Sequence, residues 1–370
     1  MARSLPKALD PIFAGLIIGL TVFGLIILLS ASGPISFQHY SDPLYFLRRQ
    51  MSLGLLPGVL AFFLVSRFDY RLLKPYAFPA LIVSIGLLLS VFIPGLGHTV
   101  GGATSWLNFG FFRLQPSELV KVTFLVYSAG WLTTYGKKEG LTVQGAMPFL
   151  IAIGAVMTLL MLQPDTGTMS VIILTALVLY FVAGAPIQWF VVIAGALAIL
   201  IGLLITIAPY RADRFLTFLH PELDPQGIGY HINQAFLAIG SGGIFGLGYG
   251  QSRQKYLYLP EVQGDSIFAV MAEEMGFVVC LLFLSAVALL IWKIFEMARA
   301  AGDDFGKYLC IGVGGWIAVQ TLVNVASMTG LMPMTGVTLP FVSYGNSATV
   351  SLFIGLGLVA SVYRHTRTSV

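Results

Sequence analysis

Charge is scarce in this chain: only 10% of its 370 residues are Asp, Glu, Lys or Arg, whereas 57% are hydrophobic and the mean hydropathy is +0.88. A soluble core cannot bury that much apolar surface, so the lipid bilayer must act as solvent for part of it. The apolar runs are continuous over roughly twenty residues and lack the alternation of apolar and polar residues that a membrane barrel needs. The scarcity of charge therefore excludes an ordinary soluble protein, and the missing alternation excludes a β-barrel.

Cysteine is almost absent as well. The two cysteines, Cys280 and Cys310, both lie within apolar runs, which favours small core residues over a disulfide or a metal site. We expect both to be small core residues. The net charge of +4 is scattered among loops, so it indicates membrane orientation and not a nucleic-acid surface.

Hydropathy predicts about ten transmembrane helices, the first of which resembles a secretory signal but is longer than an ordinary signal core. Both termini then lie on the same side, and Lys and Arg are more numerous in the loops of that side, which predicts cytoplasmic termini. The fold class expected is an all-α polytopic membrane protein, with residues 1–370 forming a single domain. The expected spans are 11–32, 48–66, 75–93, 116–135, 144–162, 168–184, 187–207, 266–294, 306–330 and 346–364.

A large extracytoplasmic loop over 209–265 precedes the eighth expected span. It contains the apolar segments HINQAFLAIG and GGIFGLGYG, so we expect it to fold back onto the membrane surface or dip into it. The glycines of SGGIFGLGYG do not indicate a nucleotide-binding loop, because no strand precedes them and no GK[ST] follows. Close backbone packing or a tight turn explains them better.

Two similar segments, LQPSEL at 114–119 and LQPDTG at 162–167, begin apolar helices on the outer side. Each is expected to place its proline at the first helical position and its acid in the first turn. Glu118 and Lys121 share a helix face and can form an ion pair. A charge inside the bilayer costs about 2.5–3.5 kcal/mol on insertion scales, so this pair indicates either a polar cavity or a structural ion pair near the interface. For Asp165, helix capping and ligand binding are both open.

The segment QSRQKYLYLPEVQGDSIFAVMAEE at 251–274 concentrates charge beside the eighth span. Asp265 at the predicted helix start favours a capping role. Arg253 and Lys255 next to Glu261 also fit a site that binds an anionic head group and leaves one carboxylate free as a base.

Other outer segments supply further candidates for the same site. The loop LMPMTGVTLPFVSYGNSATV contains Ser343 and Tyr344, and SWLNFGFFRLQPSE contains Trp106, Arg113 and Gln115. Irregular backbone near a membrane must be buried in protein or line a cavity. These segments therefore predict an extracytoplasmic polar cavity for an anionic, lipid-linked ligand.

GYGQSRQKYLYLPEVQGDSIFAVMAEEMGF, QPSELVK, QPDTGT and TGLMPMTGVTLPFVSYGNS together resemble the SEDS family of bacterial cell-wall proteins, over residues 100–364. The wording QSRQKYLYLPE resembles the division branch more than the elongation branch. Two departures leave the roles of neighbouring residues open: this chain has PEVQGD and SYGNSA, where the family commonly has PEAHTD and SYGGSS.

The resemblance implies a peptidoglycan glycosyltransferase that polymerises lipid II at the outer face of the cytoplasmic membrane, working with a class B penicillin-binding protein. It implies that Asp265 is the essential acid and that Lys121 is the cation on the QPSE helix. Our hypothesis is that Asp265 acts as general base, or alternatively holds a divalent cation (Mg²⁺ or Mn²⁺), while cations neutralise the leaving pyrophosphate. The candidate substrate-binding residues are Lys121, Glu118, Arg113, Trp106, Gln115, Asp165, Arg253, Lys255, Glu261, Ser343 and Tyr344.

Two other functions fit the same sequence. A lipid II flippase or transporter also needs a polar cavity, but it should carry charges at the membrane midplane, whereas the charges here gather at the outer face. A non-catalytic scaffold of the division machinery is the second, because glycines such as those in GVGGW at 312–316 permit close helix approach.

Overall fold

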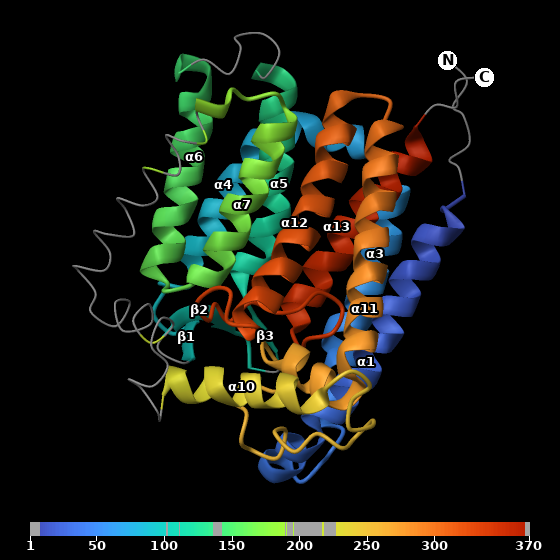
Figure 1. Cartoon of the computed structure of the whole chain (residues 1–370). Helices are drawn as coiled ribbons and strands as arrows, with labels where there is room; N and C mark the ends of the chain where they lie inside the picture. The colour runs from blue at the N-terminus through green and yellow to red at the C-terminus, as the bar shows by residue number, and fades with distance from the viewer. Residues whose placement is uncertain are drawn as a thin grey trace.

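The computed structural model describes residues 8–100, 103–110, 112–135, 143–188, 190, 195, 217 and 227–366. Its long helices form a bundle, with a small sheet and one transverse helix at one end (Figure 1). The elements are α1 (Pro11–Tyr40), α2 (Tyr45–Arg49), a π-helix (Gln50–Leu55), α3 (Leu56–Arg67), a 3₁₀ helix (Tyr70–Tyr76), α4 (Ala77–Ser90), β1 (Gly97–Val100), β2 (Ala103–Asn108), β3 (Arg113–Leu114), α5 (Pro116–Tyr135), α6 (Val143–Leu162), α7 (Thr166–Val182), α10 (Ile228–Gly242), α11 (Ile267–Arg299), α12 (Asp304–Met328) and α13 (Asn346–His365).

The helices confirm a multi-pass membrane protein. Within the described residues, six helical segments are long and apolar enough to cross a bilayer: Pro11–Tyr40, Tyr45–Arg67, Tyr70–Ser90, Ile267–Arg299, Asp304–Met328 and Asn346–His365. Helices α5, α6 and α7 occupy three more of the expected spans. The expected span at 187–207 lies almost entirely outside the described residues.

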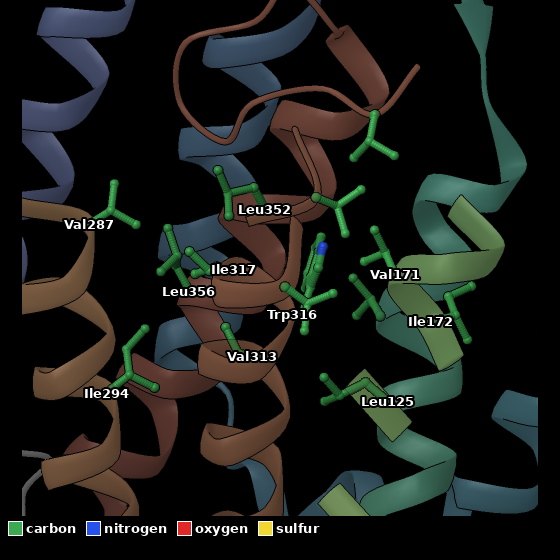
Figure 2. Packing of buried hydrophobic residues seen from close by; sticks show 14 of the residues in the cluster. Leu125, Val171, Ile172, Val287, Ile294, Val313, Trp316, Ile317, Leu352 and Leu356 are labelled. Carbon is green, nitrogen blue, oxygen red and sulfur yellow. The ribbon is translucent and has the colours of Figure 1, made fainter. Parts of the chain in front are cut away.

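Helix α12 is the centre of the bundle and packs against α5, α7, α11 and α13. Its glycines permit this crowding: a Cβ on Gly312 would lie 2.7 Å from Leu125 Cδ1. Figure 2 shows Trp316 of α12 among buried side chains of neighbouring helices, such as Leu125 and Ile172. Cys280 and Cys310 are free and buried, as expected for small core residues.

Helix α11 is broken at Gly276, whose φ of 75° interrupts the helical backbone. The glycine-rich loop after α10 inserts its backbone at this break. Bonds run from the N–H groups of Leu247 and Gly248 to the carbonyls of Glu273 and Glu274 (both 2.9 Å), and from the N–H groups of Phe277 and Val278 to the carbonyls of Gly243 and Ile244 (3.0 and 3.1 Å). The loop thus satisfies groups that a helix break leaves unpaired. This confirms the expected close backbone packing of SGGIFGLGYG.

Gly276→Ala should lower the melting temperature in detergent, because the new Cβ would lie 2.3 Å from the backbone nitrogen of Gly246 and the positive φ disfavours alanine. Overpacking of this kind costs about 1–3 kcal/mol. Gly19→Ala is the matched control, since nothing lies within 4 Å of a Cβ there; it should leave the melting temperature unchanged or slightly raised. Equal melting temperatures for the two variants would contradict the prediction.

The expectation of an all-α fold is wrong between residues 97 and 114. There the chain forms a three-stranded antiparallel sheet in the order β1-β2-β3, with His98 opposite Trp106 and Asn108 opposite Arg113. The segment GHTVGGATSWLN is too short for a spanning helix, and its threonines, valine and tryptophan favour extended backbone. The sheet holds Trp106 and Arg113 at one end of the bundle.

Helix α10 lies across the ends of the bundle helices and packs on α11 (Figure 1). Ile232, Ala235 and Ala238 face inward and are buried, whereas Phe236 and Leu237 are exposed. The described part of the expected loop therefore folds back onto the bundle. Helix α1 begins and α13 ends at the opposite end of the bundle (Figure 1), which agrees with the predicted separation of termini and polar loops.

Candidate active site

A cavity of about 910 Å³ opens at the end of the bundle that carries the sheet and α10. Its walls come from the end of α1, from α2, the sheet, the residue before α5, the starts of α7 and α13, helix α10, the segment before α11 and the segment 334–345. Sequence segments more than two hundred residues apart thus share one wall. The candidate residues that line it are Trp106, Arg113, Gln115, Asp165, Glu261, Asp265 and Tyr344.

Asp265 lies just before α11, and its half-buried side chain borders the cavity. It is not the helix cap that its position suggested: Ser266 occupies the N-cap position, and no side chain caps the helix there. Burial raises the pKa of Asp265 to about 7, and the nearby charge of Glu261 acts in the same direction. A carboxyl group with this pKa can take up a proton near neutral pH.

Two arginines line the same cavity. Arg113 is on β3, and Arg49 ends α2, where its Nη1 donates to Tyr45 Oη at 2.7 Å and its guanidinium lies 5.5 Å from the centre of the Tyr45 ring. The sequence analysis did not select Arg49 as a site residue. The pattern YFLRR, with two cations next to aromatic residues at the start of a span, was the available signal.

Lys121 and Glu118 form the predicted ion pair, with Lys121 Nζ 2.7 Å from Glu118 Oε2, but the pair does not line the cavity. Both residues are buried, at 6% and 5% exposure. Lys121 Nζ also donates to Gln320 Oε1 of α12 at 2.9 Å and lies 4.9 Å from the centre of the Trp316 ring. The pair therefore joins α5 to α12 inside the bundle.

The charges of 251–274 divide into two groups instead of forming one cluster. Lys255 is buried and bound to Glu274, with Nζ 2.7 Å from Oε1, and it also donates to Ser30 Oγ of α1. Glu273 accepts the backbone N–H of Arg253 at 2.9 Å, and the Arg253 side chain is exposed. Lys255 and Arg253 do not line the cavity, so the expectation that they join Asp265 and Glu261 is wrong.

Asp165 is the N-cap of α7, where its Oδ1 accepts the N–H of Thr168 at 3.0 Å. Its Oδ2 accepts from Ser117 Oγ at 2.8 Å and from Gln115 Nε2 at 3.3 Å. The capping interpretation is therefore confirmed, and the same carboxylate borders the cavity. Pro116 begins α5 as expected, but Pro164 lies two residues before Thr166, so its predicted helical position is wrong.

The loop before α13 forms part of the cavity wall, as predicted, but only one of its two candidate residues faces the cavity. Tyr344 lines the cavity. Ser343 is buried behind it, where its Oγ donates to the carbonyl of Gly264 at 2.7 Å and accepts the N–H of Leu339 at 2.8 Å. Ser343 thus contacts the protein backbone next to Asp265 and does not face the cavity.

His231 of α10 is a cavity residue that sequence reasoning did not select. Its Nε2 lies 2.6 Å from Ser266 Oγ. Burial lowers the pKa of His231 to about 4, so the ring is neutral at neutral pH. A single histidine within the apolar segment HINQAFLAIG was the available signal.

Fold and site together define a class: a polytopic helical membrane protein whose polar cavity, at one end of the bundle, combines a raised-pKa carboxyl group with arginines. A model of the FtsW/RodA/SpoVE family, described as cell cycle proteins, matches residues 11–368. The chain belongs to this family.

Individual relatives agree with the family. Stage V sporulation protein E of Bacillus subtilis is 37% identical over 353 residues, which cover 94% of this chain and 95% of that protein. A probable peptidoglycan glycosyltransferase FtsW of Thioalkalivibrio sulfidiphilus is 39% identical over 354 residues, covering 95% and 88%.

Solved structures have the same fold. One is a chain from a peptidoglycan synthase complex studied for its coordination of polymerization and crosslinking, with a TM-score of 0.80 at 28% identity, covering 98% of this chain and 99% of that one. Another is the rod shape determining protein RodA of Thermus thermophilus, with a TM-score of 0.72 at 30% identity and the same coverage.

Proposed function

We propose that the chain is a peptidoglycan glycosyltransferase that polymerises lipid II into glycan strands during cell division. The observation that carries this proposal is the cavity in which Asp265 and two arginines converge. Relatives that share more than a third of their residues over nearly the whole chain are named for this activity. The charges at the end of the bundle favour an enzyme over a flippase, whose ligand site should lie near the midplane.

In the proposed reaction, the ionised Asp265 removes the proton from the 4-hydroxyl of the acceptor sugar. The hydroxyl oxygen bonds to the anomeric carbon of the donor sugar, the configuration inverts, and the bond to the lipid pyrophosphate breaks. Arg113 and Arg49 line the cavity and are positioned to bind the pyrophosphate, with bidentate contacts that suit guanidinium groups. Lys121 and Lys255, which were candidates for the same role, are committed to buried ion pairs.

Binding a divalent cation is the second role that we propose for Asp265. The part of the chain that the structure describes holds no group of three or more His, Cys, Asp or Glu arranged for a metal. Mg²⁺ often uses only one or two carboxylates together with substrate phosphates, and Asp265 and Glu261 supply that donor set in one cavity. A bound cation would neutralise charge on the leaving pyrophosphate. Titration with EDTA and then Mg²⁺ or Mn²⁺ separates this role from a metal-free base.

We also propose the setting in which this reaction takes place. The chain spans the bacterial cytoplasmic membrane with both termini in the cytoplasm, so that the cavity faces outward. The excess of Lys and Arg in the loops on the side of the termini supports this orientation. The proposed partner is a class B penicillin-binding protein, supported by the similarity to a chain of a peptidoglycan synthase complex.

The decisive experiment supplies purified protein with lipid II in detergent, with and without a cognate penicillin-binding protein whose own transpeptidase is blocked. Glycan chains on a gel are expected in the presence of the partner. A flippase would give no polymer but would move labelled lipid II across sealed vesicles. A pure scaffold would give neither activity, and its loss would still stop division in cells.

The rate of polymerisation should depend on the ionisation of Asp265. Its pKa of about 7 places half of the molecules in the protonated, inactive form at that pH. If Asp265 is the base, the rate falls about tenfold for each pH unit below 7 and levels off above it. Initial rates between pH 5.5 and 8.5 at saturating lipid II measure this, and a rate that is flat from pH 8 to pH 6 would contradict it.

A further inference from the structure

Three successive backbone carbonyls at Asp265 each accept a hydrogen bond from a distant part of the chain. The carbonyl of Gln263 accepts the N–H of Tyr344 at 2.8 Å, and that of Gly264 accepts Ser343 Oγ at 2.7 Å. The carbonyl of Asp265 itself accepts Asn324 Nδ2 at 2.9 Å. The segment that carries the proposed base is therefore fixed residue by residue from α12 and from the loop before α13.

Asn324 links both of these partners. Its side chain is fully buried on α12, and its Nδ2 also donates to the carbonyl of Val337 at 2.7 Å. Both acceptors are carbonyl oxygens, which fixes the orientation of the amide. One turn earlier on the same helix, Gln320 Nε2 donates to the carbonyl of Thr338 at 2.9 Å. Helix α12 thus holds the 337–338 segment and Asp265 against each other.

The other backbone hydrogen bonds of the Asp265 segment are local, from the N–H groups of Gly264 and Ser266 to the carbonyl of Glu261 at 2.8 and 3.3 Å. The segment contains Gly264, follows Glu261 with its left-handed φ of 49°, and precedes α11. A buried amide with two good acceptors resists rotation, because moving it would leave the carbonyls without partners. Catalytic geometry is sensitive to such support, since a displacement of about 1 Å can lower a rate by about 10²-fold.

We infer that Asn324 and Ser343 are positioning residues that hold the Asp265 carboxylate in place by clamping the backbone of Gln263, Gly264 and Asp265. This inference rests on the proposed function, since it assigns how the base of that reaction is supported. Neither side chain lines the cavity, so neither is expected to touch lipid II. Their loss should lower kcat and leave KM nearly unchanged.

The test compares Asn324→Leu, which keeps the volume and removes the donor, with Ser343→Ala in the full chain with its partner. We expect kcat to fall about 10- to 100-fold for Asn324→Leu and several-fold for Ser343→Ala, with KM for lipid II within twofold of the wild type. Thr321→Val is the matched control: it also removes a buried polar group from α12, but among the residues that the structure describes the Thr321 hydroxyl bonds only to the carbonyl of Ile317 in its own helix.

The outcomes separate the inference from the proposed function. If the wild type makes no glycan, the proposed function fails. If the wild type is active and Asn324→Leu folds but keeps its kcat, or loses activity through KM alone, the inference fails. If Asn324→Leu does not fold, Ser343→Ala decides, and a wild-type kcat for that variant overturns the inference. A loss of kcat equal to that of Thr321→Val also overturns it.

Discussion

Replacing Asp265 with asparagine is expected to lower the rate of lipid II polymerisation by about 10²–10⁴-fold. Asparagine keeps the size of the side chain but can neither accept a proton as a base nor hold a cation as a carboxylate does. The carboxylate is half-buried in the cavity wall and caps no helix, so its loss should leave the fold intact. Gel analysis of the glycan product measures the rate, and the melting temperature together with capture of the penicillin-binding protein verifies folding.

Glu261→Gln is the control that separates an effect on the pKa of Asp265 from the loss of the reacting carboxylate itself. Glu261 lines the same cavity, and its charge helps to raise the pKa of Asp265. If Asp265 is a metal-free base, removing that charge should move the pH profile to lower pH while the maximal rate stays close to that of the wild type; if Asp265 and Glu261 together hold a cation, the maximal rate should fall as well. An Asp265→Asn protein that folds, binds its partner and polymerises at the wild-type rate would rule out both roles proposed for the aspartate.

Lys255→Met is expected to destabilise the protein by about 3–5 kcal/mol, because it leaves the Glu274 carboxylate buried without its cation. Lys255 and Glu274 are 3% and 1% exposed, so solvent does not screen the pair. Ser30 Oγ donates to both oxygens of Glu274, but a hydroxyl cannot neutralise the charge. Thermal unfolding in detergent should show a large fall in melting temperature.

The double variant Lys255→Met with Glu274→Gln removes both charges and should regain most of the lost stability, because replacing a whole buried pair is far milder than breaking it. Arg253→Met is the exposed control from the same loop and should change stability little, since the Arg253 side chain is exposed. A double variant no more stable than Lys255→Met alone would show that the ion pair is not the source of the effect.

Features encoded within one helix were predictable. The apolar runs indicated the spans, and the spacing of Glu118 and Lys121 predicted an ion pair that the structure confirms. Capping was one of the two roles left open for the acid of LQPDTG, and the structure confirms it. In each case the interacting groups lie within one or two turns, so periodicity alone places them together.

Long-range pairing could not be predicted in this way. Lys255 is nearer in sequence to Glu261 and Asp265 than to Glu274, and it binds Glu274 because the glycine-rich loop folds back along α11 at Gly276. The bond from Asn324 to Asp265 crosses 59 positions of sequence. Arg49 joins the site only because α2 ends at the cavity. These three long-range contacts depend on how the helices are arranged in space, which composition and residue spacing do not reveal.

The break in α11 has a consequence for membrane insertion. From Phe277 to Arg299 the helix still has roughly 23 residues, or about 34 Å at 1.5 Å per residue, enough to cross a bilayer unaided. The short helical piece before Gly276, which carries Glu273 and Glu274, need not pass through lipid during translocation. This piece can take its final position once the glycine-rich loop donates hydrogen bonds to the carbonyls of Glu273 and Glu274. The segment that carries Asp265, which directly precedes this piece, would then take its final place after the spans themselves.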